Sequence, residues 1–345
     1  MVSHGAESVV RPGEPGARVA LRDAMARHWE TPEPGAAYQA GPVPDVQALR
    51  SPALRRLRAV VLLGGTLRVT ALRGGIDRSV LDLPVEPGRT LLAFWREQCI
   101  HLAETLGMRG MAVRLVLDRA ASEPRHGWVA DQRVMLVVER DPVEYRGTGG
   151  VLRDLAECYD KEDYLLIGNA AQLLRSPLPA LAAALAATDA EVAVIAHEDG
   201  TPSGLMLARC GCLREIPSSG FIDMKEQSLP AIARRHRVEV VQRQHPSGLP
   251  LHTLADYIEA LRRHHGEMSG DGADPAYAED WKPIFSLVEF PDDVHPRARI
   301  HNSVVLKGGR VEEGAVVVGS VVCPGAVVRR GTMVADELVT ANRGR

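Results

Sequence analysis

An uninterrupted apolar run, AVVLL at residues 59–63, constrains the fold of this chain more than any other segment. Gly64 and Gly65 follow it directly, and Thr66 and Arg68 come next. A strand that is apolar at every position is typical of a parallel sheet buried on both faces. Glycines leave backbone N–H groups open to a phosphate, and an arginine adds bidentate charge. The segment therefore predicts a buried strand followed either by a phosphate-binding loop or by an ordinary turn.

Further apolar runs alternate with segments of helical periodicity downstream of residue 58. Leu91, Trp95 and Leu102, for example, recur at helical spacing between two strand-like runs. Strands that alternate with helices predict an α/β fold with a mostly parallel sheet covered on both faces. Ligands of such sheets bind beyond the C-terminal strand ends, where Gly64 and Gly65 are expected. The predicted strands cover residues 59–63, 111–117, 133–138, 163–167, 191–196, 204–208 and 238–241.

A 17-residue repeat follows the α/β region. Residues 302–318 read NSVVLKGGRVEEGAVVV and residues 319–335 read GSVVCPGAVVRRGTMVA, so that Val304 corresponds to Val321. Apolar residues recur there at spacings of six, six and five, which is the hexapeptide pattern of a parallel β-helix. About two coils bury too little apolar area to stand alone, so we expect them to pack on the sheet domain or on another subunit.

These patterns divide the chain into four parts. Residues 1–57, rich in Pro, Gly, Arg and Glu, form an N-terminal extension or arm, and residues 58–265 form the α/β domain. Residues 266–283 form a polar linker, and residues 284–345 form the β-helix.

Composition excludes some classes of partner. A net charge of -3 over 345 residues gives no reason to expect a nucleic-acid or membrane partner. The apolar run at residues 178–187 is too short to span a bilayer. Five mostly scattered cysteines predict reduced thiols and a cytoplasmic location. Cys210 and Cys212 form a CxC pair without a second pair at zinc-site spacing, so we expect no metal there.

Four segments, in order along the chain, resemble sequences of one enzyme family. They are AVVLLGG at 59–65, GRTLLAFWREQ at 88–98, EYRGTGGVL at 144–152 and GFIDMKEQ at 220–227. With the terminal repeat they resemble the sugar-1-phosphate nucleotidyltransferases, also called NDP-sugar pyrophosphorylases. The resemblance covers about residues 58–335. It implies a Rossmann-like nucleotidyltransferase domain followed by a left-handed β-helix.

The resemblance also implies a chemistry. Family members join a nucleoside triphosphate to a sugar-1-phosphate and release pyrophosphate, which requires cationic groups and a divalent ion held by carboxylates. A nucleotide or NDP-sugar would then be the ligand, and Asp223 and Lys225 would contact the sugar phosphate. The implied nucleotide-binding residues are Gly64, Gly65, Thr66, Arg68, Gly147, Thr148 and Gly149.

Three charged positions of that chemistry differ in this chain. The place of the family's lysine holds Ser79, which leaves Arg68 and Arg78 as catalytic candidates. The place of the first metal-binding aspartate holds an alanine, Ala170 or Ala171 according to the register. The place of the second, in the segment SGLPLHTLADY, holds a proline at position 250. A protein without these groups has no metal ligand at that site and is expected to be catalytically impaired.

We therefore predict a nucleotide- or NDP-sugar-binding or regulatory subunit, in a homo-oligomer or with a catalytic paralogue. An active enzyme that holds Mg²⁺ through relocated ligands, such as Asp154, Asp223 or Asp256, is the alternative. A third possibility is an acyltransferase that uses His295 or His301 of the β-helix as a general base.

Overall fold

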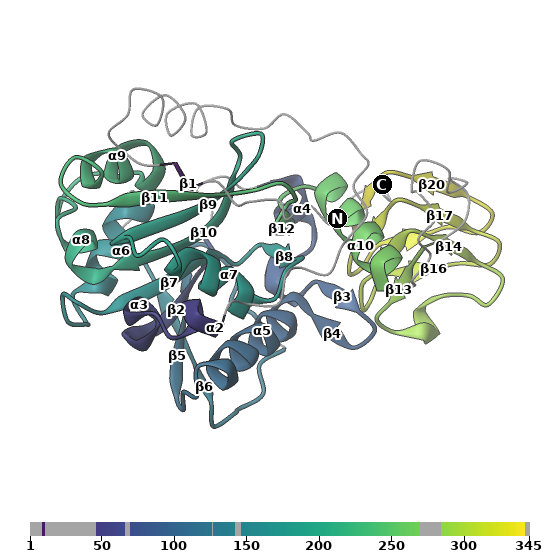
Figure 1. The fold of residues 1–345 in the computed structure, drawn as a ribbon. Coiled ribbons are helices and arrows are strands. Elements are labelled where there is room, and N and C mark those ends of the chain that lie inside the picture. Colours follow the sequence, from purple (N-terminus) through teal and green to yellow (C-terminus); the bar gives the residue numbers. More distant parts are fainter. Residues whose placement is uncertain are drawn as a thin grey trace.

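The computed structural model describes residues 9–10, 46–65, 70–125, 127–141, 146–268 and 284–341. Eight strands form one central sheet in the order β1-β11-β9-β10-β7-β2-β5-β6 (Figure 1). Adjacent strands are parallel from β7 through β2 and β5 to β6, and also between β9 and β11. β10 is antiparallel to β7 and β9, and β1 is antiparallel to β11. The strands are β1 Val9–Val10, β2 Leu57–Leu63, β5 Met111–Leu117, β6 Val134–Arg140, β7 Tyr164–Asn169, β9 Val192–His197, β10 Pro202–Arg209 and β11 Val238–Arg243.

The apolar run at 59–63 lies in β2, in the middle of this sheet. β2 pairs in parallel with β5 on one side and β7 on the other. Ala59, Val61 and Leu62 are each 0% exposed, because protein surrounds the strand on both edges and both faces. The mostly parallel sheet is confirmed, and each strand predicted in the α/β region overlaps one of the strands above.

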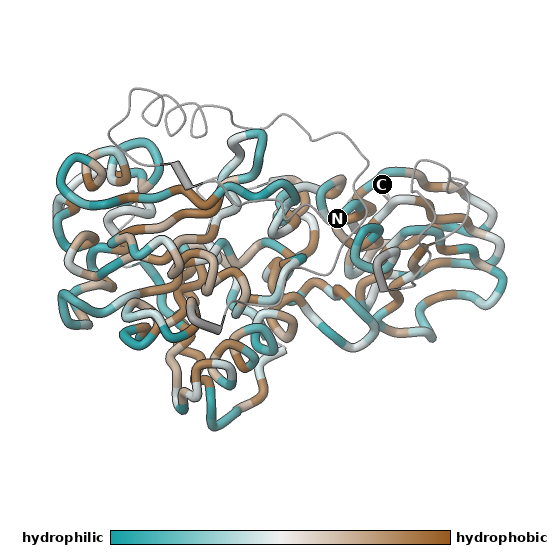
Figure 2. The backbone as a smooth tube through the Cα atoms, viewed as in Figure 1, coloured by the Kyte–Doolittle hydropathy of each residue, from teal (hydrophilic) through white to brown (hydrophobic). Residues whose placement is uncertain are grey.

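Helices cover both faces of the sheet, as the alternating pattern predicted. Val60 and Leu62 belong to a core cluster with residues of α5 and α7, whereas Ala59 and Val61 belong to a second cluster with residues of α6 and α8. Since alternate strand residues point to opposite faces, the two clusters lie on opposite sides of the sheet. Figure 2 shows hydrophobic stretches along the central strands and hydrophilic ones in many surrounding loops. The helices are α2 Val46–Leu49, α3 Pro52–Arg55, α4 Ala71–Gly75, η1 Val80–Asp82, α5 Leu91–Thr105, α6 Gly147–Ala156, α7 Leu178–Ala186, α8 Cys210–Arg214, η2 Met224–Ser228, α9 Leu229–Ile232 and α10 Leu254–Met268.

The C-terminal residues form three parallel sheets with the predicted repeat. Each paired residue lies 17 positions from its partner, as Leu287 does from Val304 and Val304 from Val321. The pairing begins earlier than the sequence repeat indicated, since β13 and β14 add a turn before residue 302. The sheets are β13-β15-β18-β21 (Ser286–Val288, Ser303–Val305, Val321–Val322, Leu338–Val339), β14-β17-β20 (Arg299–His301, Val316–Val318, Met333–Ala335) and β16-β19 (Arg310–Val311, Val327–Val328).

One corner of this repeat has the same backbone conformation in three successive turns. Asn302, Gly319 and Asp336 follow one another at the repeat distance and have φ of 45°, 55° and 52°. Such left-handed φ angles are tolerated by Gly, Asn and Asp, which explains the small residues that the pattern placed at corners. The Asn302 side chain also accepts hydrogen bonds from the N–H groups of Ile284 and Phe285, which fixes the first turn.

Polar contacts join the C-terminal sheets to the α/β domain. Arg78 forms a two-bond ion pair with Glu289, at 2.8 and 2.9 Å, and both side chains are largely buried. Helix α10 lies at this junction (Figure 1), and its buried Tyr257 donates a hydrogen bond of 2.6 Å to the Pro84 carbonyl in β3. His264 of the same helix reaches Glu86 at 2.7 Å. The remaining short strands are β3 Pro84–Glu86, β4 Arg89–Thr90, β8 Gln172–Leu174 and β12 Gly248–Pro250, and a further 3-10 helix, η4, spans Pro291–Asp293.

Some residues outside the predicted α/β boundaries belong to that domain. β1 extends the edge of the sheet beside β11, and Ala53 and Leu54 of α3 join the core. Helix α10 continues to Met268, past the predicted boundary at 265. The rest of residues 1–45, and residues 269–283 of the predicted linker, lie outside the described part of the chain. Among the described helices, none has the length and apolar character required to cross a membrane.

The Tyr257 hydroxyl gives a test of the contact between α10 and β3. We expect Tyr257→Phe to lower the free energy of unfolding by about 1–3 kcal/mol, because the buried Pro84 carbonyl loses its donor while the ring stays in place. Tyr159→Phe is the control, since the Tyr159 hydroxyl is only half-buried and accepts one bond of 3.3 Å from Arg114. Urea denaturation of both variants checks this, and equal losses would contradict the role of the Pro84 contact.

Candidate functional site

A cavity of about 820 Å³ lies beyond the C-terminal ends of the parallel strands. Leu63 at the end of β2, Asp118 after β5, Asp141 after β6 and Asn169 at the end of β7 line it. Its opposite wall comes from the N-terminal turn of α6 and from η2. This is the position in which α/β sheets bind ligands, and it is the edge at which the sequence placed the site.

The two glycines after β2 have structural reasons for their small size. The N–H of Gly64 donates a bond of 2.8 Å to the Val116 carbonyl, so this N–H is not free for a phosphate. A Cβ on Gly65 would lie 2.7 Å from the backbone nitrogen of Asp118. Gly65 lines the cavity and Gly64 does not, which corrects the prediction that both offer backbone N–H groups to a nucleotide. The other two loop candidates, Thr66 and Arg68, lie outside the described residues.

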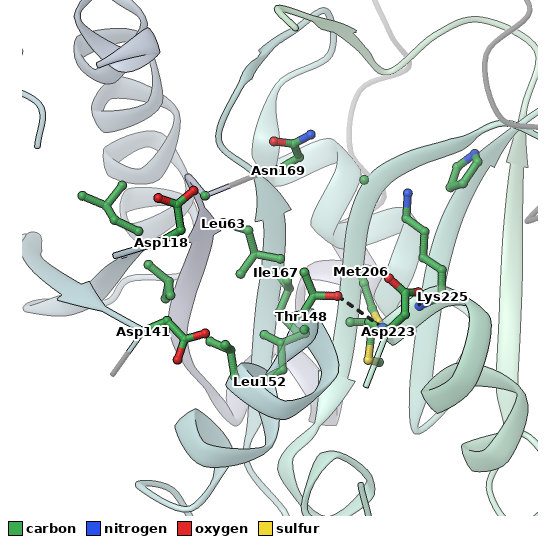
Figure 3. Close-up of a pocket in the computed structure, with 18 of the residues that line it drawn as sticks. Leu63, Asp118, Asp141, Thr148, Leu152, Ile167, Asn169, Met206, Asp223 and Lys225 are labelled. Carbon is green, nitrogen blue, oxygen red and sulfur yellow. Dashed lines mark hydrogen bonds between the residues drawn. The ribbon is translucent and has the colours of Figure 1, made fainter. Parts of the chain in front are cut away.

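The start of α6 packs tightly on the segment before η2. Gly147 has φ of +69°, and a Cβ there would lie 2.4 Å from the Ile222 carbonyl oxygen. The N–H of Gly149 donates to that same carbonyl at 2.9 Å, so Gly149 is not a free donor for a ligand. Thr148, which is exposed in the cavity wall, accepts a bond of 3.2 Å from the Met224 N–H (Figure 3). Gly147 and Thr148 therefore stay candidates by position, whereas Gly149 has a packing role.

Asp223 and Lys225 face the cavity from η2, on the side opposite Asp118 and Asp141 (Figure 3). Asp223 caps this helix, because its Oδ1 accepts hydrogen bonds from the N–H groups of Lys225 and Glu226 at 2.7 and 2.8 Å. The Lys225 side chain lines the cavity and is open to solvent there. Burial lowers the pKa of Lys225, and the nearby Asp223 carboxylate partly offsets that effect. Lys225 is thus a cation of the site that a ligand anion can reach.

Sequence reasoning missed several charged residues of the cavity, among them Asp118, Asp141, Arg73, Arg119 and Arg146. Asp118 and Asp141 each come directly after a strand, and Arg73 enters from α4. Arg73 donates a bond of 2.8 Å to the Gly64 carbonyl; burial lowers its pKa, and Asp118 acts in the opposite direction. The signal for the two aspartates was present, because parallel strands bring the residues that follow them to one edge.

Within residues 169–171, Asn169 lines the cavity and the two alanines that follow it do not. Ala170 is 0% and Ala171 5% exposed, and both lie in the apolar core. Asn169 is a neutral amide whose Oδ1 accepts a bond of 3.0 Å from the Ala171 N–H. Asn169 thus offers an amide to the cavity, and none of these three residues carries a carboxylate. Pro250, at the end of β12, is exposed and offers no ligand atom on its side chain.

The other candidate residues have structural partners. Arg78 reaches the rim of the cavity, but it is ion-paired with Glu289. Asp154 is paired with Arg146 and Arg153, and Asp256 accepts the Thr253 N–H at the start of α10. Neither aspartate is among the residues that line the cavity. Of the two histidines proposed as acyltransferase bases, His295 is exposed and accepts the Arg297 N–H, while His301 lies in β14.

Comparison with known proteins gives similarity of structure only. No family model and no curated protein matches the chain. HddC from Yersinia pseudotuberculosis is 14% identical, with a TM-score of 0.43 over 60% of this chain and 100% of HddC. The same protein complexed with GMP-PN gives 14% identity and a TM-score of 0.42 over the same shares. The UDP-glucose pyrophosphorylase from Acinetobacter baumanii is 10% identical, with a TM-score of 0.49 over 62% of this chain and 95% of that one. With TM-scores below 0.5, the function of this chain has to be inferred from its own residues.

The packing at the start of α6 gives a test with a matched control. Gly147 and Gly110 have nearly the same φ, +69° and +67°, but nothing lies within 4 Å of a Cβ placed on Gly110. We expect Gly110→Ala to cost about 1–2 kcal/mol of unfolding free energy for its backbone conformation alone. Gly147→Ala should cost about 1–3 kcal/mol more, because its Cβ collides with Ile222. Denaturation curves compare the two variants, and equal costs would show that the close packing at Ile222 is not what requires a glycine.

Proposed function

We propose that the chain is a nucleotide- or NDP-sugar-binding protein of the nucleotidyltransferase fold, impaired in nucleotidyl transfer. The observation that carries the proposal is the cavity at the C-terminal strand ends, which presents Lys225 and the Thr148 hydroxyl but has Asn169 where a metal-binding carboxylate is expected. Its volume of about 820 Å³ lies within the range of small-molecule sites. The order of the sequence segments that resemble the family supports the same interpretation.

The chemistry of the cavity fits ligand binding better than metal-dependent transfer. Val194, Met206 and Ile167 give it an apolar wall suited to the faces of a base or a sugar, while Lys225 and Arg73 supply positive charge for phosphate oxygens. Mg²⁺ beside a triphosphate requires carboxylate oxygens. At the two positions that the resemblance assigns, an alanine and a proline provide no ligand for that ion, and the neighbouring Asn169 offers only an amide.

We further propose that the C-terminal parallel sheets form a short β-helix of the hexapeptide type. Its 17-residue pairing distance supports this, as does the repeated left-handed corner at Asn302, Gly319 and Asp336. A β-helix with open coil ends favours assembly with a second copy or with a catalytic paralogue. In that assembly the chain would act as a binding or regulatory subunit in the cytoplasm.

The active enzyme remains the second candidate because of Asp118 and Asp141. Both line the cavity, and they follow neighbouring strands β5 and β6. Asp118 also packs against Gly65, where the phosphate loop of the family begins. These aspartates would have to replace the ligands that Asn169 and Pro250 do not provide.

Binding with and without metal tests the first proposal. We expect NDP-sugars to raise the thermal midpoint of the protein in the presence of EDTA, since binding to the folded state stabilises it. Lys225→Met should weaken this binding by tenfold or more, because a bond to a charged group contributes about 1.5–3 kcal/mol. Lys161→Met is the control, on the exposed loop before β7. Stabilisation by nucleoside triphosphates only when Mg²⁺ is present would contradict the proposal.

The pH dependence of the same binding gives a second test. Because burial lowers the pKa of Lys225 below the ordinary lysine value of 10.5, its positive charge is lost at a lower pH than on an exposed lysine. Affinity for an anionic ligand should therefore fall as the pH rises from neutral toward 10 and recover as it is lowered. In Lys225→Met, titration calorimetry should find no such fall in affinity as the pH rises. The same decline in the variant would assign it to another group.

Pyrophosphate release separates the two candidate functions. With Mg²⁺, sugar-1-phosphates and nucleoside triphosphates, we expect no turnover by the wild-type protein. If turnover occurs and is lost in Asp118→Asn or Asp141→Asn but kept in Asp154→Asn, the active enzyme is the correct assignment. Asp154 is a suitable control, since its carboxylate pairs with Arg146 and Arg153 and does not line the cavity.

A further inference from the structure

A cluster of Glu191, Cys212 and His236 lies at the edge of the sheet opposite the cavity. One ligand atom from each of the three side chains lies within 4.8 Å of the other two. Glu191 immediately precedes β9, whereas the residues of β9 that line the cavity lie toward its C-terminal end. The cluster is therefore separate from the candidate nucleotide site.

Three segments far apart in sequence bring these side chains together. Cys212 comes from α8, and His236 lies between α9 and β11. Cys212 is 0% exposed, while the side chains of Glu191 and His236 are 30% and 13% exposed. The cluster is thus buried on its thiol side and open to solvent at the carboxylate, which gives an ion a way in.

His236 is already oriented as a metal-binding histidine is. Its Nδ1 lies 3.2 Å from both carboxylate oxygens of Glu191. Its Nε2 lies 2.8 Å from Glu215 Oε1. A histidine that binds a metal through one ring nitrogen commonly donates the other N–H to a carboxylate, which fixes the ring and its tautomer. Glu215 takes that second position here.

The charges around the cluster are not balanced, and a dication would balance them. Arg209 contacts Glu191, Glu162 and the Cys212 thiol, and Arg235 lies 3.5 Å from Glu215. With the thiol ionised, four negative groups (three carboxylates and a thiolate) face two guanidinium groups, which leaves two negative charges. Arg237 donates its backbone N–H to Glu191 at 3.0 Å, and its guanidinium pairs with Glu239. A divalent ion would neutralise the remainder.

We propose that Glu191 Oε, Cys212 Sγ and His236 Nδ1 bind one Zn²⁺ ion, with water in the fourth position. Thiolate, imidazole and carboxylate together favour zinc over magnesium or calcium. Bond lengths of about 2.0–2.3 Å place tetrahedral zinc ligands roughly 3.4–3.6 Å apart, so small side-chain movements close the site. On binding, the Cys212 thiol proton passes to solvent, and His236 binds through an unprotonated Nδ1 while its Nε2–H faces Glu215.

The site would connect the start of β9, helix α8 and the start of β11. Such an ion would stabilise the folded chain, because a ligand that binds only the folded state shifts unfolding to higher temperature. From the sequence we expected no metal at Cys210 and Cys212, because only pairs of cysteines were considered as zinc ligands. In the fold, a histidine and a glutamate from elsewhere complete the set.

Metal titration of the full-length, reduced and metal-stripped protein tests the proposal. We expect one Zn²⁺ per chain by calorimetry and elemental analysis, a higher thermal midpoint with ZnCl₂, and a thiolate-to-metal charge-transfer band when Co²⁺ replaces zinc. Cys212→Ser should abolish the band, and His236→Gln should weaken binding at least as much. Glu215→Gln should weaken it by about 10–100-fold through the lost support of the ring.

Cys210→Ser is the matched control, since Cys210 is a buried thiol of the same short helix and not part of the cluster. It should keep the stoichiometry, the affinity and the Co²⁺ band. The proposal is overturned if the wild-type protein binds no stoichiometric zinc or gives no thiolate band. It is equally overturned if Cys210→Ser loses the band and Cys212→Ser keeps it.

Discussion

The burial of β2 between β5 and β7 is the constraint on which the rest of the structure depends. Its backbone groups are paired on both edges, and its alternate side chains enter two separate cores. Parallel pairing then brings the ends of β2, β5, β6 and β7 to one edge of the sheet. The cavity with Asp118, Asp141 and Asn169 exists because these strands end together.

Close packing, more than ligand chemistry, accounts for the glycines in the segments that resemble the nucleotidyltransferase family. Gly65 makes room for the backbone of Asp118, and Gly147 makes room for Ile222. Gly64 and Gly149 donate their N–H groups to protein carbonyls. The packing of the chain therefore accounts for these glycines without a ligand in the cavity. Side chains such as Lys225 are then better indicators of a ligand than the glycine loops.

Charged contacts lie at both ends of the strands of the α/β sheet. Arg78 reaches the rim of the cavity and is also ion-paired with Glu289 of the C-terminal sheets, so the cavity and these sheets share a charged group. At the opposite edge of the α/β sheet, His236 contacts both Glu191 and Glu215. The candidate nucleotide site and the proposed zinc site thus lie at different ends of the same strands and can be tested independently.

The sequence by itself determined the strands, the main helices and the 17-residue repeat, because these depend on the local periodicity of apolar residues. It also predicted a ligand site at the edge of the sheet where the cavity lies. Only the tertiary structure decided which residue of the segment 169–171 lines the cavity, since a shift of one position turns a strand residue to the other face. Only the tertiary structure shows that Cys212 lies near His236 and that Arg78 pairs with Glu289. Contacts between distant segments depend on how the elements pack, and they leave no local pattern in the sequence.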